Sequence, residues 1–410
     1  MTLGAVVRRG IETLLVATIC VASAFAQATP KERLTVNLGF RDWGPTTIVG
    51  TTIIGGNSSN RGGLFAVDTV TGKLKWSARP VGLPGTFVAT KPAVAGDVVV
   101  VPMGNTLVAF KLATGKEIWR GPKTQQGASV AADISTAYVL GEDNNFYAFD
   151  AATGRQKWKV GFVRGPCEAV PVVRDGVVYV TGSVVVTPAD ANQRSSFYRH
   201  LFALDANTGK ERWRYPAKPI GNTGGVCFTQ PIVTADAFFA VAESTLYGVN
   251  LSTGRERWSP LDVRRPVEGR ERSVNVGGLV DAGPVLVGVT SGYLIAFDKA
   301  SGKTAWEIPG QYRETSPSTA VSGRILYFQG HPGAPPAAEV QGRIVYSGGK
   351  PVTQAEALPP GKLNALDLDT RKILWSFSRI TAEPNWAFGF VSPAADGLWV
   401  DSYQALVKLQ

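Results

Sequence analysis

The residues of this chain that could take part in catalysis are few and far apart. His200 and His331 are the two histidines, and no metal-ligand spacing relates them. The chain has no Gly-x-Ser-x-Gly motif and no glycine-rich phosphate loop. His331 lies in a Gly-His-Pro-Gly segment, where we expect a lone exposed loop histidine with an incidental role rather than a catalytic one. The sequence therefore predicts no catalytic residue and no metal site.

A second set of polar and aromatic residues precedes the first strand of successive sequence repeats. If those strands surround a common axis, the side chains line one end of it, which we call the axial mouth. They could hold an anionic planar ligand there or clamp a peptide. Equally, they could plug this end and pair with one another. The candidate ligand- or partner-binding residues are Arg41, Trp43, Gln125, Glu168, Arg272, Arg313 and Trp386.

Two cysteines occupy equivalent positions in consecutive repeats. Cys167 lies four residues before Pro171, and Cys227 lies four residues before Pro231. In an oxidising compartment this placement predicts a disulfide, which would stabilise the fold by about 4 kcal/mol in the chain-entropy model. The alternative is a pair of free buried thiols.

The placement of the candidate residues depends on a sequence motif that recurs along the chain, which we call the phrase. It is an apolar run ending in Ala-x-Asp, followed by Thr-Gly-Lys/Arg and then by Trp. Successive tryptophans are 43, 39, 55, 45, 48 and 69 residues apart. A period of about 45 in a strand-rich sequence is typical of four-stranded sheets arranged around an axis, as in a β-propeller. The sequence therefore predicts an all-β fold in one domain over 27–410. The repeat tryptophans are Trp76, Trp119, Trp158, Trp213, Trp258, Trp306 and Trp375.

One repeat shows how its residues favour four antiparallel strands. Residues 92–95 predict a short first strand, 98–103 a strand buried on both faces, 107–110 a third strand, and the segment around Trp119 a fourth. The aspartate of the phrase can accept backbone N–H bonds inside the last turn, and its glycine supplies a left-handed conformation. Because one sheet cannot cover its own faces, the tryptophan must be buried between neighbouring sheets.

The copies differ in their turns and in their length. Arg371 replaces the turn glycine in copy seven, at a cost of about 1–2 kcal/mol unless that turn is of another type. Inserts at 184–199 and 330–361 lengthen copies four and seven. We expect both inserts at the surface, where they are functional or merely tolerated.

The two ends of the mature chain predict how the fold closes. After Trp375 an eighth unit begins but stops at Gln410 without a fourth strand. A spare strand at 34–38 precedes the first full repeat. The economical interpretation is an eight-bladed propeller in which the N-terminal strand pairs with the C-terminal blade and removes the free sheet edges. Seven blades are the alternative if the tail packs irregularly.

Residues 1–26 read as an export signal. A basic start, an apolar stretch and Ala24-Phe25-Ala26 before Gln27 have the pattern of a cleaved signal peptide. No later segment approaches the ~20 apolar residues that span a bilayer. Cleavage leaves 40 basic and 31 acidic residues, a positive balance that favours anionic partners such as lipid head groups or acidic glycans. Nucleic acid is not expected outside the cytoplasm.

The phrase from Ala203 to Trp213 resembles the tryptophan-docking repeat of the PQQ-like (pyrroloquinoline quinone) β-propeller family, and it recurs over essentially the whole mature chain. One branch comprises quinoprotein alcohol and sugar dehydrogenases, with PQQ and calcium over the central axis. The other is similar to BamB, a non-enzymatic scaffold of outer-membrane protein assembly. The dehydrogenase branch has two adjacent cysteines, whereas Cys167 and Cys227 are 60 residues apart. No motif places its calcium ligands either, so the resemblance is closest in kind to BamB.

This resemblance implies an exported, non-catalytic scaffold that presents a rigid surface to other envelope proteins and needs no cofactor. A second hypothesis is a PQQ-dependent or other redox enzyme that holds PQQ with calcium at the axial mouth. A third is a glycan or cell-wall binder that uses the basic surface. We expect a periplasmic or secreted monomer.

Overall fold

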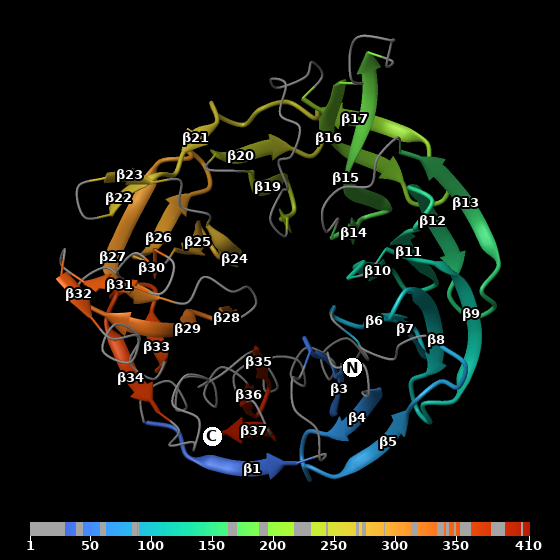
Figure 1. Ribbon diagram of the computed structural model, residues 1–410, viewed down its shortest axis with the longest axis horizontal. Helices are drawn as coiled ribbons and strands as arrows, with labels where there is room; N and C mark the ends of the chain where they lie inside the picture. The colour runs from blue at the N-terminus through green and yellow to red at the C-terminus, as the bar shows by residue number, and fades with distance from the viewer. Residues whose placement is uncertain are drawn as a thin grey trace, which may run out of the picture. The chain divides into compact units, whose positions relative to one another are not determined.

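The computed structural model consists of β-strands and turns in every segment that it describes (Figure 1). The described residues are 29–37, 44–57, 63–83, 88, 90–125, 127–162, 170–187, 196–216, 231–242, 245–267, 270–272, 276–290, 292–312, 319–333, 340–341, 344–347, 350–352, 362–378, 390–402 and 405–410. None of these segments forms a helix long and apolar enough to cross a membrane. The predicted export signal at 1–26 lies outside the described residues.

The chain divides into two compact units. The larger unit comprises Phe40–Thr290 and Ile295–Glu307, and the smaller unit comprises Met1–Gly39, Ser291–Leu294 and Ile308–Gln410. β26 (Tyr293–Asp298) and β27 (Thr304–Tyr312) contribute residues to both. The prediction of one domain over 27–410 stays a prediction.

The larger unit contains five complete four-stranded antiparallel sheets among its described residues, each in simple sequence order. β24 (Gly277–Ala282) and β25 (Val285–Val289) form a further pair, and β22 (Arg265–Val267) and β23 (Arg270–Arg272) form a two-stranded sheet. The four-stranded sheets are β2 (Thr47–Val49), β3 (Thr52–Gly56), β4 (Leu64–Asp68) and β5 (Leu74–Ala78); β6 (Ala93–Ala95), β7 (Val98–Met103), β8 (Thr106–Lys111) and β9 (Glu117–Lys123); β10 (Val130–Ala132), β11 (Thr136–Leu140), β12 (Asn145–Asp150) and β13 (Gln156–Gly161); β14 (Val172–Arg174), β15 (Val177–Thr187), β16 (Ser196–Asp205) and β17 (Glu211–Tyr215); and β18 (Ile232–Val233), β19 (Ala237–Ala242), β20 (Thr245–Asn250) and β21 (Leu261–Asp262).

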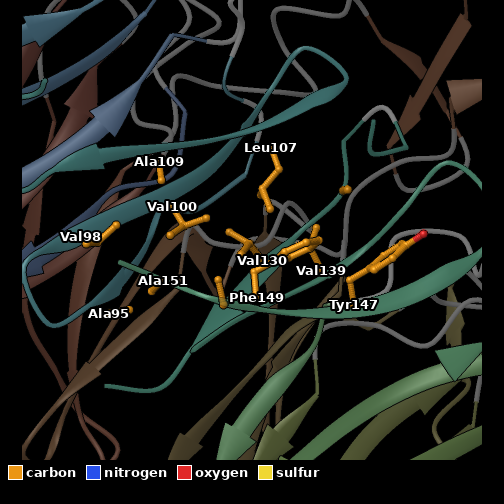
Figure 2. Packing of buried hydrophobic residues seen from close by; sticks show 12 residues of the cluster. Ala95, Val98, Val100, Leu107, Ala109, Val130, Val139, Tyr147, Phe149 and Ala151 are labelled. Atoms are coloured by element: carbon orange, nitrogen blue, oxygen red, sulfur yellow. The ribbon is translucent and has the colours of Figure 1, made fainter. Parts of the chain in front are cut away.

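The core lies between consecutive sheets, as the two-faced apolar strands predict. Side chains alternate along β7, so Val98 and Val100 pack against the following sheet while Val99 and Val101 pack against the preceding one. Figure 2 shows the first of these layers, where Val130, Val139 and other side chains of β10–β13 meet those of β6–β9. All six residues of β7 are buried. Each sheet therefore needs both neighbours to cover its faces.

Each repeat tryptophan described in the larger unit from Trp76 to Trp258 docks on the last turn of the following sheet. The Trp158 Nε1 atom donates to the Ala206 carbonyl oxygen at 2.9 Å, and a Cβ atom added to Gly209 would lie 2.7 Å from its ring. The corresponding bonds are Trp76 to Leu112, Trp119 to Ala151, Trp213 to Leu251 and Trp258 to Lys299. The glycines thus have two roles, since each adopts a left-handed φ and leaves room for an indole ring.

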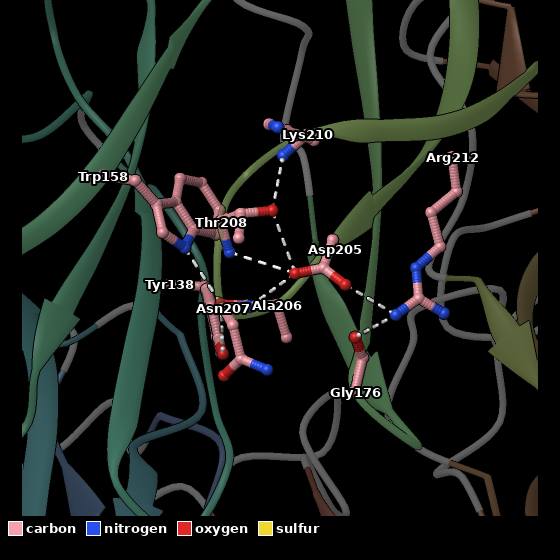
Figure 3. A network of polar contacts seen from close by, with 9 residues as sticks. All are labelled: Tyr138, Trp158, Gly176, Asp205, Ala206, Asn207, Thr208, Lys210 and Arg212. Atoms are coloured by element: carbon pink, nitrogen blue, oxygen red, sulfur yellow. Dashed lines mark hydrogen bonds and ion pairs between the residues drawn. The ribbon is translucent and has the colours of Figure 1, made fainter.

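The aspartate of the phrase organises the turn on which the tryptophan docks (Figure 3). The Asp205 Oδ1 atom accepts bonds from the backbone N–H groups of Asn207 and Thr208 and from the Thr208 hydroxyl group. Its Oδ2 atom pairs with Arg212 at 2.7 Å. The predicted role of this aspartate as an acceptor for backbone N–H groups is confirmed.

The Asp205 network predicts a pH dependence. The Arg212 guanidinium, followed by the Thr208 hydroxyl, lowers the pKa of Asp205 to about 2, whereas an unfolded aspartate has a pKa of about 3.9. Since the folded pKa is the lower one, the contribution to stability is present above the unfolded pKa and is lost as pH falls toward 2. We expect the difference in melting temperature between the wild type and Asp205→Asn to be constant from pH 7 to 5. It should shrink between pH 4 and 2, and a difference that stays unchanged there would contradict the assignment.

Copy five departs from the predicted pattern, because its tryptophan precedes the fourth strand instead of lying in it. Trp258 occupies a bend ahead of β21, and its ring stacks at 6.3 Å on Phe239. Pro260 lies between Trp258 and β21, and it has no N–H group that could bond in a strand ladder. A Cβ atom on Gly248 would lie 2.6 Å from the Trp258 ring, which explains glycine where other copies have alanine.

The smaller unit contains the predicted pairing of the two chain ends. β1 (Glu32–Val36) pairs antiparallel with β37 (Ala405–Leu409), with Val36 opposite Leu406, in the sheet β1-β37-β36-β35. The observed strand begins two residues before the predicted 34–38. A second sheet packs against this one through Trp375 and neighbouring apolar side chains. The remaining strands of the first sheet are β35 (Val391–Ala394) and β36 (Gly397–Ser402). The second sheet contains β28 (Ala320–Ser322), β29 (Ile325–Pro332), β33 (Leu363–Asp367) and β34 (Ile373–Phe377).

Both inserts contain strands in their described parts. The insert at 184–199 extends β15 and β16 as a hairpin in which Val184 lies opposite Tyr198. The insert at 330–361 contains β30 (Val340–Gln341), β31 (Ile344–Ser347) and β32 (Lys350–Val352), which form a three-stranded sheet. The number of blades stays a prediction.

Arg371 adopts the left-handed conformation that glycine has in the other copies, with φ of 59°. We expect Arg371→Gly to raise the free energy of unfolding by about 1–2 kcal/mol, because the Cβ strain of this conformation is removed. Arg371→Ala is the matched control, since it removes the long side chain and keeps Cβ. Denaturant titration of the three proteins tests this, and equal effects of both variants would contradict strain as the cause.

Candidate functional site

The structure describes two of the seven residues predicted at the axial mouth. Gln125 is described completely, and Arg272 is described only by its backbone, at the end of β23. The other predicted mouth residues, and the two cysteines of the predicted disulfide, lie outside the described residues: Arg41, Trp43, Glu168, Arg313, Trp386, Cys167 and Cys227. The assembled mouth and the disulfide therefore stay predictions.

The first strands of consecutive sheets lie side by side in the larger unit. Figure 1 shows β6, β10 and β14 together, while the fourth strands β9 and β13 lie on the outer side of their sheets. The Thr47 hydroxyl group donates to the Pro92 carbonyl oxygen at 2.5 Å, and the Thr90 hydroxyl group donates to that of Ala128 at 3.0 Å. These bonds connect the beginning of β2 with the segment before β6, and that segment with the one before β10, so they position this end of the larger unit.

Gln125 is hydrogen-bonded within its own sheet. Its Nε2 atom donates to the Asn144 Oδ1 atom at 3.3 Å, and its backbone carbonyl accepts from the Ala128 N–H group. Asn144 has a left-handed φ of 63° in the turn between β11 and β12. Of the two alternatives for the mouth residues, the geometry of Gln125 favours pairing with a neighbouring side chain over binding a ligand.

The same turn carries a hydrogen-bonded carboxylate. The Asp143 Oδ2 atom accepts from the Tyr147 hydroxyl group and from the Asn145 Nδ2 atom, each at 2.6 Å. Desolvation works to raise the pKa of Asp143, but the bonds from Tyr147 and Asn145 outweigh it and lower the pKa. The Asp143 bond in turn raises the pKa of Tyr147. Asp143 is therefore an ionised acceptor that fixes the turn, not a proton donor.

Lys91 is a residue at this end that sequence reasoning missed. It precedes Pro92, two residues before β6, which is the position from which the other repeats contribute to the predicted mouth. Its surface is exposed, yet surrounding protein atoms desolvate the ammonium group and lower the pKa of Lys91. The signal that could have found it is the lysine in front of the proline that opens the first strand of copy two.

The two histidines are part of the sheets. His200 is buried in β16, its Nδ1 atom lies 2.8 Å from the Pro216 carbonyl oxygen, and burial lowers its pKa. This favours a neutral structural imidazole. The prediction that His331 lies in an exposed loop is wrong, because it is half-buried in β29 opposite Gln311. The strand continues past Gly330 because β27 supplies a pairing edge.

The smaller unit has its own buried polar group next to the insert at 330–361. The Asn364 Nδ2 atom donates to the Gly330 and Lys362 carbonyl oxygens, and its Oδ1 atom accepts from the Ser376 hydroxyl group at 2.7 Å. Every polar atom of this buried amide is therefore engaged. Asn364 fixes the strand ends from which the insert leaves.

No three His, Cys, Asp or Glu side chains in the described segments are grouped as metal ligands. The carboxylates described above are engaged by turn residues, and the adjacent cysteines of quinoprotein dehydrogenases do not occur in the sequence. What the described part of this end offers is a shaped surface fixed by hydrogen bonds.

Comparison with protein families gives one match over most of the chain. The sequence profile of the family described as outer membrane protein assembly factor BamB matches residues 21–135, 103–260 and 193–376.

Relatives with named activities are similar over shorter stretches. The chain is 27% identical to the serine/threonine-protein kinase AfsK of Streptomyces griseus over 48% of this chain and 24% of that protein. It is 28% identical to the dehydrogenase subunit of the quinone alcohol dehydrogenase of Gluconobacter oxydans, over 40% of this chain and 22% of the relative. The tetrathionate hydrolase of Acidithiobacillus ferrooxidans is 25% identical over 65% and 53%, respectively. The chain therefore spans about a quarter of the first two relatives.

Two solved structures share the fold. BamB from Moraxella catarrhalis superposes with a TM-score of 0.58 at 16% identity, covering 93% of this chain and 98% of that one. The computationally designed protein Ika8 superposes with a TM-score of 0.63 at 12% identity, covering 92% and 99%. At these identities the likeness concerns the fold alone. The predicted all-β fold of four-stranded antiparallel sheets, with the N-terminal strand in the C-terminal sheet, is confirmed.

Proposed function

We propose that this chain, which belongs to the BamB family of PQQ-like repeat proteins, is a non-catalytic scaffold of the cell envelope. In this proposal it is an exported protein that binds other envelope proteins through a preformed surface and needs no cofactor. Family membership supports the fold and the class of function, while the partner is a matter for experiment.

The observation that carries this proposal is the state of the polar side chains at the axial-mouth end. The Gln125 amide, the Asp143 carboxylate and the His200 imidazole are each bound within their own sheet. Each of these groups is already used by a neighbour in its sheet, whereas a catalytic site needs groups that face a reacting atom. Groups engaged in this way hold turns in a fixed shape, which is what a docking surface needs.

Rigidity of the larger unit supports the same interpretation. Indole rings dock on the next sheet, and Thr47 and Thr90 connect successive first strands. A surface that does not rearrange on binding loses less conformational entropy, so a preformed scaffold can bind its partner with modest contacts.

Site-specific photo-crosslinking tests the scaffold. A photoreactive amino acid at Glu142 or Lys123, both exposed at the axial-mouth end, should crosslink an envelope protein in cells of the source organism. The same amino acid at Lys116, at the opposite end of its sheet, is the matched control and should not give that adduct. Untagged protein in excess should remove the adduct. No adduct at either mouth position, or equal adducts at all three positions, would contradict the proposal.

A quinoprotein oxidoreductase is the second candidate, favoured by the similarity to quinone-dependent alcohol dehydrogenases. Titration of the protein with PQQ and calcium decides between the two. We expect no saturable change in quinone absorbance and no calcium-dependent increase in melting temperature. Stoichiometric binding with both changes would favour the enzyme and overturn the non-catalytic assignment.

A further inference from the structure

One end of each of the seven repeats carries an unpaired positive charge. We call it the Thr-Gly end, because the third strand there reverses through the Thr-Gly or equivalent turn. The residue after the turn glycine, or after Arg371 in copy seven, is a lysine or arginine with an exposed side chain in all seven copies. In the described part of the chain these side chains make no ion pair or hydrogen bond. They are Lys73, Lys116, Arg155, Lys210, Arg255, Lys303 and Lys372.

Several exposed carboxylates at this end are paired with cations other than the repeated ones. The exposed carboxylate of Asp97 binds Lys111 at 2.8 Å, and that of Asp236 binds Arg257 at 2.7 Å. Asp205 is held by Arg212. The repeated cations, which pair with none of these carboxylates, therefore remain available to an anionic partner.

Six of these cations follow one another along the larger unit at fixed positions. Each of five docking glycines, from Gly115 to Gly302, contacts the tryptophan of the preceding sheet, and the cation is the next residue. The first turn of every sheet lies at the same end, since Leu112 donates its N–H to the Asp97 carbonyl and Ala151 donates to that of Ser135. The fold thus places one such cation at the same end of each of six successive repeats of the larger unit.

Exposed aliphatic side chains lie at the same end. Five large hydrophobic residues are exposed among those described, and four of them are at the Thr-Gly end of their sheets. Ile134 is 84% exposed in the turn that binds Ala151, and Val70 and Leu74 flank Lys73 at 59% and 46%. Ile373 follows Lys372 in the smaller unit, whereas Val81 lies at the opposite end of its sheet. Aliphatic groups of this kind have no role in binding a soluble polyanion.

We propose that the Thr-Gly end of the larger unit binds the surface of an anionic lipid bilayer. Its cations face the phosphate groups, and Val70, Leu74 and Ile134 enter the boundary between head groups and acyl chains. Each Lys or Arg near a negatively charged membrane adds a small attraction, and a row of them together with apolar anchors gives reversible peripheral binding. This assignment leaves the axial-mouth end free for a protein partner, and it does not depend on that partner.

Vesicle co-sedimentation tests this surface. The full chain should bind vesicles of phosphatidylglycerol and phosphatidylcholine but not of phosphatidylcholine alone, and molar salt should release it. Substituting Lys73, Lys116 and Lys210 by glutamine should weaken binding roughly fivefold per cation, thus roughly 100-fold in total. The matched control replaces Arg79, Lys123 and Lys362, exposed cations at the other ends of their sheets, by glutamine and should bind as the wild type does.

A second pair of variants separates a bilayer from an acidic polymer. Leu74→Ser with Ile134→Ser should weaken vesicle binding several-fold and leave any retention on immobilised alginate unchanged. Binding to alginate without binding to vesicles would overturn the proposal in favour of an acidic polysaccharide. Equal losses in the Thr-Gly-end and control variants would overturn it as well, because the charge would then act without regard to position. Melting temperatures of all variants verify that they fold.

Discussion

Replacing Trp158 by alanine is expected to lower the free energy of unfolding by about 3–5 kcal/mol. Trp158 is 8% exposed, and its indole ring packs against Tyr138 and Phe146 and donates to the Ala206 carbonyl oxygen of the next sheet. The variant loses this burial, leaves a cavity between two sheets and removes a donor from the turn. Denaturant titration followed by tryptophan fluorescence and circular dichroism measures the change.

Ile134→Ala is the control for this substitution, since it removes an aliphatic group that is 84% exposed in the sheet that contains Trp158. We expect an effect within about 0.5 kcal/mol. A loss of less than about 1 kcal/mol for Trp158→Ala would mean that the indole does not couple the two sheets.

Gly209→Ala is expected to destabilise the protein by about 2–5 kcal/mol. Gly209 has φ of 70°, so a side chain adds about 1–2 kcal/mol of backbone strain. Its new Cβ would also lie 2.7 Å from the Trp158 ring, and overpacking of this kind costs about 1–3 kcal/mol. Gly176→Ala measures the backbone contribution alone. Gly176 has φ of 71° in the same sheet, and the position of its added Cβ is open space.

The free energies of unfolding of the two variants give the result directly. Gly176→Ala should lose only the backbone contribution, and Gly209→Ala should lose more by the cost of the ring contact. If the two variants lose the same amount, the indole does not restrict the turn, and only the left-handed conformation explains the glycine.

Much of the fold could be predicted from the sequence because the residue pattern of each repeat predicts the strands of that repeat. The unbroken apolar run from Val98 predicted a strand buried on both faces, and the spare segment around Leu34 predicted the pairing with the last sheet. Asp205 and Gly209 were assigned their turn roles from residue type alone. The second role of the glycine could not be predicted, because the ring that it accommodates comes from a residue 51 positions earlier.

The candidate site was less predictable, for physical reasons that particular residues illustrate. The partner of Gln125 is Asn144, and such pairing depends on how two turns meet rather than on sequence spacing. Lys91 has no motif around it, and only the packing of neighbouring segments perturbs its pKa. His331 looks like a loop residue beside proline and glycine, but the edge of β27 extends its strand. The charged Thr-Gly end was visible as a repeated Lys/Arg, although its exposed aliphatic neighbours were not.

The central claim is that an indole ring from one sheet occupies the space left by the glycine of the next, and a double-mutant cycle between Trp158 and Gly209 tests it most directly. If the claim holds, Gly209→Ala should cost about 1–3 kcal/mol less in a protein that already carries Trp158→Ala, since the methyl group then enters the vacated space. Free energies of unfolding of the wild type, both single variants and the double variant give this coupling. Effects that add to within about 0.5 kcal/mol would contradict the claim.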